Sequence, residues 1–208
     1  MKKTLIYAFT LSSLLVGLGS CKKDYGPNGI GPLQDSLADV PVTVTNQEFF
    51  ERVPIVTASL TKPVPGGAAT ARGPFTITFR IPSDKGTIRE IRQIQTGAVG
   101  LSLLATGAPI QAFNFDGSAT APALRPIAGN GTNEITFTSS LADYTTYRTR
   151  ILALPAATRF NPGNDATLLY PNATFNAQNP NQLRFFFKLT LENGQEIVPM
   201  EVRVRITP

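Results

Sequence analysis

The last part of the chain, residues 183–206, reads LRFFFKLTLENGQEIVPMEVRVRI and decides the fold. Two strand-like runs, residues 183–191 and 196–206, flank the segment Glu192–Gln195. The Asn-Gly pair inside that segment is the strongest short signal for a hairpin, because both residues tolerate a positive φ. The stretch therefore predicts an antiparallel hairpin as the last element of the chain.

The register of this hairpin follows from its apolar residues. The predicted facing pairs are Leu189–Val198, Phe187–Met200, Phe185–Val202 and Leu183–Val204. A slip of one residue would turn each apolar side chain toward the wrong face. Pro199 cannot donate to a ladder, which favours a four-residue turn over residues 192–195 that directs its nitrogen outward. Arg184 then faces Arg203, and an acid such as Glu201 between them is favoured over an anion-binding face.

Strand-like alternation also occurs upstream of the hairpin. Apolar residues alternate with Thr or Arg in three segments, which we predict as strands: Phe75–Ile81, Ile135–Thr138 and Tyr147–Ile151. Val53–Leu60, with Pro54 near its start, is a further candidate strand. Ile88, Ile91 and Ile94 recur every three residues, which fits a short helix or a bulged strand, and the neighbouring strands favour the strand. Residues 141–144 are expected to form one helical turn, and residues 160–182 a long loop with at most one short strand.

These elements predict an all-β fold, a single antiparallel β-sandwich over residues 49–208. The aromatic strand, Asn-Gly turn and Val/Arg alternation of residues 183–206 resemble the closing strands of immunoglobulin-like or fibronectin-like modules in Bacteroidetes-type surface lipoproteins. The resemblance implies an immunoglobulin-like or fibronectin-like topology. The Cys…Trp…Cys signature of true immunoglobulin domains is absent, and a jelly roll is the alternative.

The N-terminus has the pattern of a secretory leader. Lys2 and Lys3 precede 16 uncharged residues, 4–19, which is shorter than the about 20 apolar residues of a membrane span. We therefore predict that residues 1–20 form a signal helix that is removed. Leu18-Gly19-Ser20-Cys21 resembles the lipobox of bacterial lipoproteins: an aliphatic residue, two small residues and cysteine. The resemblance implies that Cys21 becomes the first mature residue and carries acyl chains such as palmitate, which make the membrane a partner.

The residues after Cys21 bear on the location of the protein. Lys22 stands where enteric lipoproteins retained in the inner membrane have Asp, and residues 22–24 resemble the charged stretch of Bacteroidetes-type surface lipoproteins. The expected location is the outer membrane or cell surface. Residues 21–48 are predicted to be the lipidated N-terminus and a flexible tether, because the Gly and Pro residues of 25–32 break regular structure. The alternative is that Val40–Val44 forms an edge strand.

The composition excludes several chemistries. The chain has no His and no Trp, and Cys21 is its single Cys. Disulfides, Cys/His zinc sites and a Ser-His-Asp triad are therefore excluded, and we predict no enzymatic activity, no metal and no cofactor. The formal net charge is +5, but the basic residues are scattered along predicted strands, so nucleic acid is not an expected partner.

Three groups of residues are candidate ligand sites. Asn114–Ser118 places oxygen ligands around a glycine, as a calcium loop does, but it lacks the distal acid, so a plain turn is favoured. Asn161, Asn164 and Asp165 form a similar group. Tyr144 and Tyr147 are candidate surface aromatics for a glycan, although packing is the favoured role. The predicted function is a lipid-anchored, non-enzymatic interaction or structural module with an unknown protein partner; the alternative is a glycan-binding surface lipoprotein.

Overall fold

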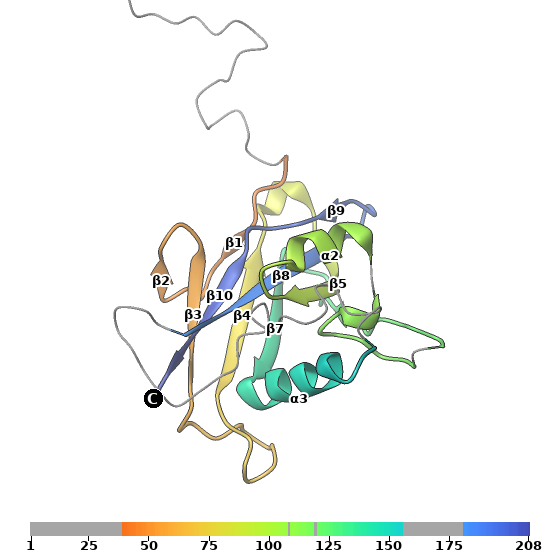
Figure 1. Cartoon of the computed structure of the whole chain (residues 1–208). Coiled ribbons are helices and arrows are strands. Elements are labelled where there is room, and N and C mark those ends of the chain that lie inside the picture. The colour runs from red at the N-terminus through yellow and green to blue at the C-terminus, as the bar shows by residue number, and fades with distance from the viewer. Residues whose placement is uncertain (1–38, 108, 119, 156–180) are drawn as a thin grey trace, which may run out of the picture. The chain divides into compact units, whose positions relative to one another are not determined.

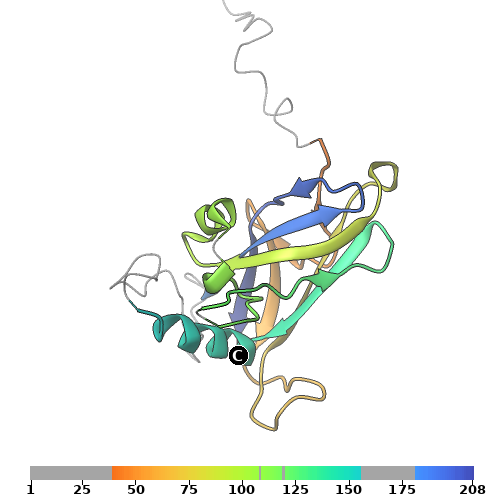
Figure 2. The same ribbon diagram turned by 90° about the vertical axis from the view of Figure 1, so that its right-hand side faces the viewer.

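A computed structural model describes residues 39–107, 109–118, 120–155 and 181–208, which form two packed β-sheets and two short helices (Figures 1 and 2). The mostly β fold is as predicted. The predicted signal helix, Cys21, the tether up to residue 38 and most of the predicted loop 160–182, with Asn161, Asn164 and Asp165, lie outside the described residues.

The larger sheet has seven strands. Its order is β2-β3-β10-β8-β5-β6, and β9 pairs with β8. The bounds are β2 Phe49–Phe50, β3 Pro54–Ser59, β5 Ile88–Thr96, β6 Ile127–Ala128, β8 Gln182–Leu191, β9 Glu196–Ile197 and β10 Val202–Thr207. The pair β3–β10 is parallel, so the expectation of a wholly antiparallel sandwich is wrong at this place.

The smaller sheet has the order β1-β4-β7, with β1 Thr43–Val44, β4 Pro74–Arg80 and β7 Glu134–Ser140. Because β1 pairs with β4, the edge-strand alternative for residues 40–44 is confirmed for Thr43–Val44. Val40 and Val44 are buried, so the folded part begins before Phe49. One core between the two sheets holds the alternating apolar residues of β4 and β7 against those of β8, β10 and β5. Phe185 and Phe187 of β8 lie in this core and contact Phe75 and Phe79 of the smaller sheet.

The C-terminal hairpin has two registers. Val202 pairs with Phe185 and Val204 with Leu183, as predicted. Nearer the turn, however, Leu189 pairs with Ile197, so the predicted pairs Leu189–Val198 and Phe187–Met200 are wrong. The loop is one residue shorter than expected: Gln195 O accepts from the Leu191 N–H (2.9 Å), and Gly194 has a φ of 85°. The surplus residue is absorbed at 198–201, where Pro199 cannot donate to the ladder.

The three isoleucines spaced by three residues lie in strand β5, as favoured. The pairing of β5 with β8 shifts between Ile88 and Glu90 and again between Ile91 and Gln93. Each bulge adds one residue, which returns the next isoleucine to the core face. Ile88, Ile91 and Ile94 are consequently all fully buried.

The segment predicted as a strand over Tyr147–Ile151 is instead part of helix α3, Leu141–Leu152. The single expected turn extends because Ser140 caps the helix: its hydroxyl accepts from the Asp143 N–H (3.1 Å) and donates to the Asp143 carboxylate (2.7 Å). The buried residues of α3 are Leu141, Tyr144, Tyr147 and Ile151, three or four apart, as one helix face requires. Helix α2, Gly100–Thr106, was not predicted, and it packs on β5 and β8.

Gly129, between β6 and β7, is the position where an added methyl group has least room. A Cβ there would lie 2.1 Å from Ile88 O and 3.0 Å from Arg89 O, both backbone atoms of β5. We expect Gly129→Ala to lower the free energy of unfolding by about 3 kcal/mol, measured by urea denaturation.

Gly131→Ala is the matched control for this substitution. Its Cβ would meet nothing within 4 Å, and it carries only the strain of a φ of 75°, about 1 kcal/mol. Equal stability of the two variants would contradict the close packing of Gly129 against the backbone of β5.

Candidate functional site

Two arginines and one glutamate form a cluster on the face of the larger sheet that points away from the core. Arg184 and Arg203 stand directly opposite each other on β8 and β10. Glu201 lies between them: its Oε1 accepts from Arg184 Nε (2.9 Å) and from Arg203 Nε (2.7 Å), and its Oε2 from Arg184 Nη2. The predicted acid between the two arginines is confirmed.

The arginines also control the ionisation of this acid. Burial alone would raise the pKa of Glu201, but the hydrogen bonds and charges of Arg184 and Arg203 outweigh it and hold that pKa below its ordinary value of 4.5. A lowered pKa in the folded state stabilises the fold above pH 4.5, and this contribution is lost as the pH falls through the lowered value.

We expect Glu201→Gln to reduce the free energy of unfolding at neutral pH by about 1 kcal/mol, because both arginines are partly exposed and solvent screens the loss. At strongly acidic pH, where Glu201 itself is protonated, variant and wild type should be equally stable. Urea denaturation at the two pH values measures this. The control Glu192→Gln, in the exposed turn, should change stability at neither pH.

Phe49 extends the cluster toward the edge of the sheet. Phe49 pairs with Ile55, and Ile55 with Arg203, so these residues form one row that ends at Arg184. Phe49 is 46% exposed and Phe50 60%. The Arg205 guanidinium lies 4.8 Å from the centre of the Phe49 ring and is paired with Glu51 at 2.6 Å. We call Phe49, Arg184, Arg203 and Arg205 the arginine–phenylalanine surface; Phe50, which pairs with Pro54, points to the opposite side of β2.

The sequence alone did not single out Phe49 and Phe50. Their signal was present, since two adjacent aromatic residues beside Glu48 and Glu51 are unusual in a core strand. Their exposure, however, depends on the pairing of β3 with β10 and on the shortness of β2.

Tyr144 and Tyr147, the candidate surface aromatics, belong to the core. They are 1% and 5% exposed, so neither ring is available to a glycan, and the favoured packing role is the correct one. The Tyr147 hydroxyl accepts from Thr96 Oγ1 (3.1 Å) and donates to Gln111 O (3.2 Å), which ties α3 to β5. Burial raises the pKa of both tyrosines.

The calcium-like segment is a turn, as favoured. The Asp116 carboxylate is held by Arg125 at 3.0 Å, and the Asp116 N–H donates to Ala123 O. The Asn114 side chain lies along β5: its Oδ1 accepts from the Ile94 N–H (2.9 Å), and its Nδ2 donates to Arg92 O (3.0 Å). The oxygen atoms of both residues are therefore engaged within the fold.

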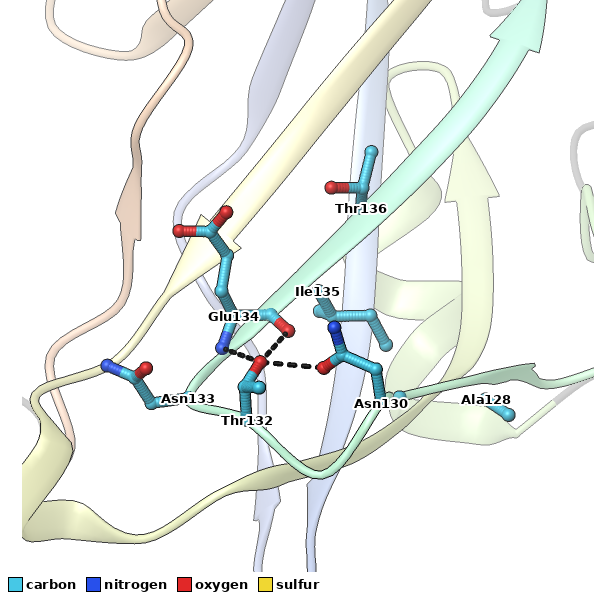
Figure 3. A pocket seen from close by; sticks show the side chains of 8 residues that line it. Ala128, Asn130, Thr132, Asn133, Glu134, Ile135 and Thr136 are labelled. Carbon is cyan, nitrogen blue, oxygen red and sulfur yellow. Dashed lines mark hydrogen bonds between the residues drawn. The ribbon is translucent and has the colours of Figure 1, made fainter.

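A polar hollow of about 480 Å³ opens beside β7 (Figure 3). It is lined by residues 128–130 and 132–136. The Thr132 hydroxyl lies 2.6 Å from Asn130 Oδ1 and accepts from the Glu134 N–H (3.2 Å). Glu134 is the one titratable residue of the lining, and its carboxylate is paired with Arg80 at 2.6 Å. The hollow thus offers hydrogen-bonding groups and no free acid–base pair.

The part of the chain that the structure describes contains no group of three or more His, Cys, Asp or Glu side chains placed to hold a metal ion. None of its helices has the length and apolar character to cross a membrane. Comparison of the chain with protein-family models, curated proteins and solved structures gives no match.

Proposed function

We propose that this protein is a lipid-anchored, non-enzymatic protein of the cell envelope that binds a protein partner through the arginine–phenylalanine surface. The observation that carries the proposal is the exposure of Phe49 beside the Arg205 guanidinium. The leader and Cys21 supply the location, the outer membrane or cell surface, with the acylated cysteine holding the domain at the membrane.

The composition of this surface supports an interaction role. The central parts of protein interfaces are enriched in aromatic residues and Arg, and a few such residues provide most of the binding energy. Arg184 and Arg203 are already positioned by Glu201, and Arg205 by Glu51 and the Phe49 ring. Side chains held in place before binding lose less conformational entropy when a partner docks.

The strand order supports an immunoglobulin-like topology as part of this proposal. In such domains one sheet holds strands A, B, E and D and the other C, F and G, to which the variable type adds C′. The sheet β1-β4-β7 corresponds to A, B and E, and β10-β8-β5-β6 to G, F, C and C′. Strand β3, parallel to β10, is an addition at the G edge.

Capture of envelope proteins tests the interaction surface. We expect the wild type to retain a partner and the double variant Phe49→Ser/Phe50→Ser to bind it at least about 30-fold more weakly, as the loss of a hot spot implies. Val198→Ser/Met200→Ser is the matched control, because these residues are 44% and 53% exposed and lie outside the surface. Capture that survives the Phe substitutions would contradict the proposal.

Glycan binding is the second candidate, since an exposed aromatic pair is what a sugar platform needs. Successive strand residues point to opposite faces, however, so Phe49 and Phe50 do not form one flat platform. A glycan array screened with the wild type and the double Phe variant separates the candidates: hits that the variant loses favour the glycan, and the absence of hits removes it.

A further inference from the structure

Strand β7 is an edge strand with its own hydrogen-bonding groups directed outward. It pairs with β4 alone. On β4, Thr78 directs its groups toward β1, because its C=O accepts from the Thr45 N–H and its N–H donates to Asn46 Oδ1. In an antiparallel strand the N–H and C=O groups of successive residues point to opposite sides. Ile77 and Phe79 therefore direct theirs toward β7, where they pair with Phe137 and Ile135. Thr136 and Thr138 therefore point their N–H and C=O groups away from β4.

At other sheet edges, side chains form the backbone hydrogen bonds that a neighbouring strand would otherwise form, and we call such an edge closed. Asn46 bonds to β4, Asn114 to β5, and the Glu48 carboxylate accepts from the Thr57 N–H of β3 (2.9 Å). On β7, the Thr132 hydroxyl closes the outward groups of Glu134 in the same way. Closed edges prevent pairing with other chains.

Thr136 and Thr138 have no such closure. Among the described residues, no group bonds to their outward N–H or C=O, and both residues are exposed. The unpaired part of the edge therefore begins at Thr136, the next outward-directed residue after Glu134, whose groups bond to Thr132. The edge thus presents two unpaired residues at the spacing of a strand, about 6.8 Å.

The polar hollow lies beside this open edge. Figure 3 shows residues 128 and 130 on one side of β7 and β4 on the other, with Thr136 beyond Glu134 along the strand. Its lining contains amide and hydroxyl groups from Asn130, Thr132 and Thr136. There is consequently space, and there are hydrogen-bonding partners, for the side chains of an added strand.

We propose that the open edge of β7 binds an extended segment of a partner polypeptide, which adds to the smaller sheet as a fourth strand at Thr136–Thr138. Alternating N–H and C=O groups are complemented by the backbone of another extended chain. The exposed threonines favour β-branched or hydroxyl side chains at the facing positions, since Thr–Thr cross-strand pairs are stabilising. This inference goes beyond the proposed function, because it concerns the other sheet and requires neither the anchor nor Phe49 and Phe50.

The test uses random peptides displayed on phage and selected on the full chain in detergent. Selected peptides should bind Thr136→Pro at least about tenfold more weakly than wild type, because proline removes the outward N–H and leaves the pairing with β4 intact. Thr136→Val keeps the N–H and should bind as wild type does. Phe49→Ser/Phe50→Ser should also bind as wild type does, which separates this site from the arginine–phenylalanine surface.

Hydrogen exchange gives a readout that needs no variant. The amide protons of Thr136 and Thr138 should exchange rapidly in the free protein and become protected with the peptide bound. Failure to select peptides, equal binding to Thr136→Pro, or amides protected in the free protein would overturn the proposal. A concentration-dependent dimer that Thr136→Pro abolishes would also overturn it, since the occupant would then be a second copy.

Discussion

Replacing Cys21 by Ser should move the protein from the membrane fraction to the soluble fraction. In the proposed anchor the thiol accepts the lipid, and a hydroxyl group does not replace it. Burial of an acyl chain contributes about 0.8 kcal/mol per CH₂, so a chain of about 14 methylenes gives on the order of 11 kcal/mol. Two or three such chains make release negligible, and their loss removes the attachment entirely. Fractionation of envelopes, with mass spectrometry of the mature N-terminus, measures the effect.

Ser20→Ala is the matched control for this prediction. It keeps a small residue before the cysteine, so cleavage and acylation should continue and the protein should remain with the membranes. A Cys21→Ser protein that sediments with membranes as the wild type does would exclude the lipid anchor, whatever the β-sandwich binds.

The second large effect is expected in the core. Phe185→Ala should lower the free energy of unfolding by about 3–5 kcal/mol, because it leaves a cavity among rings that cannot close around it. Phe185 is fully buried, and its ring centre lies 5.5–6.3 Å from five other rings, those of Phe75, Phe113, Phe137, Tyr144 and Phe187. Chemical denaturation followed by circular dichroism measures the difference.

Phe50→Ala provides the comparison, since it removes the same atoms from an exposed position. Its effect on stability should stay within about 0.5 kcal/mol. If Phe185→Ala were as mild, the core assigned to the two sheets would be wrong.

The alternation of apolar and polar residues correctly predicted the strands that have one apolar and one polar face. Phe185–Val202 and Leu183–Val204 pair as expected because both strands alternate there, and Glu201 lies between Arg184 and Arg203 because two opposed cations need an anion. The pairs nearer the turn could not be predicted in the same way. Their register depends on whether the loop closes at Gln195, and Gly194 permits the tighter loop.

Most of helix α3 was missed because its apolar residues fit both the two-residue period of a strand and the 3.6-residue period of a helix. Residues 147–151 alternate like a strand, and their threonine neighbours favour that prediction. The helical spacing of Leu141, Tyr144 and Tyr147, together with the Ser140–Asp143 cap, is what the folded chain follows. The arginine–phenylalanine surface and the open edge of β7 were beyond local patterns, since both depend on which strands become neighbours.

The position of β10 between β3 and β8 affects how the chain acquires its fold. Its partner β3 lies near the start of the folded part, and the Ser59 hydroxyl bonds to the carbonyl of Pro208, the last residue, 149 positions away. The larger sheet is therefore incomplete until β10 has been synthesised. Pairing across such sequence distances makes folding slow. Strands β3 and β8, more than 120 residues apart in the sequence, can therefore join one sheet only after β10 has been synthesised.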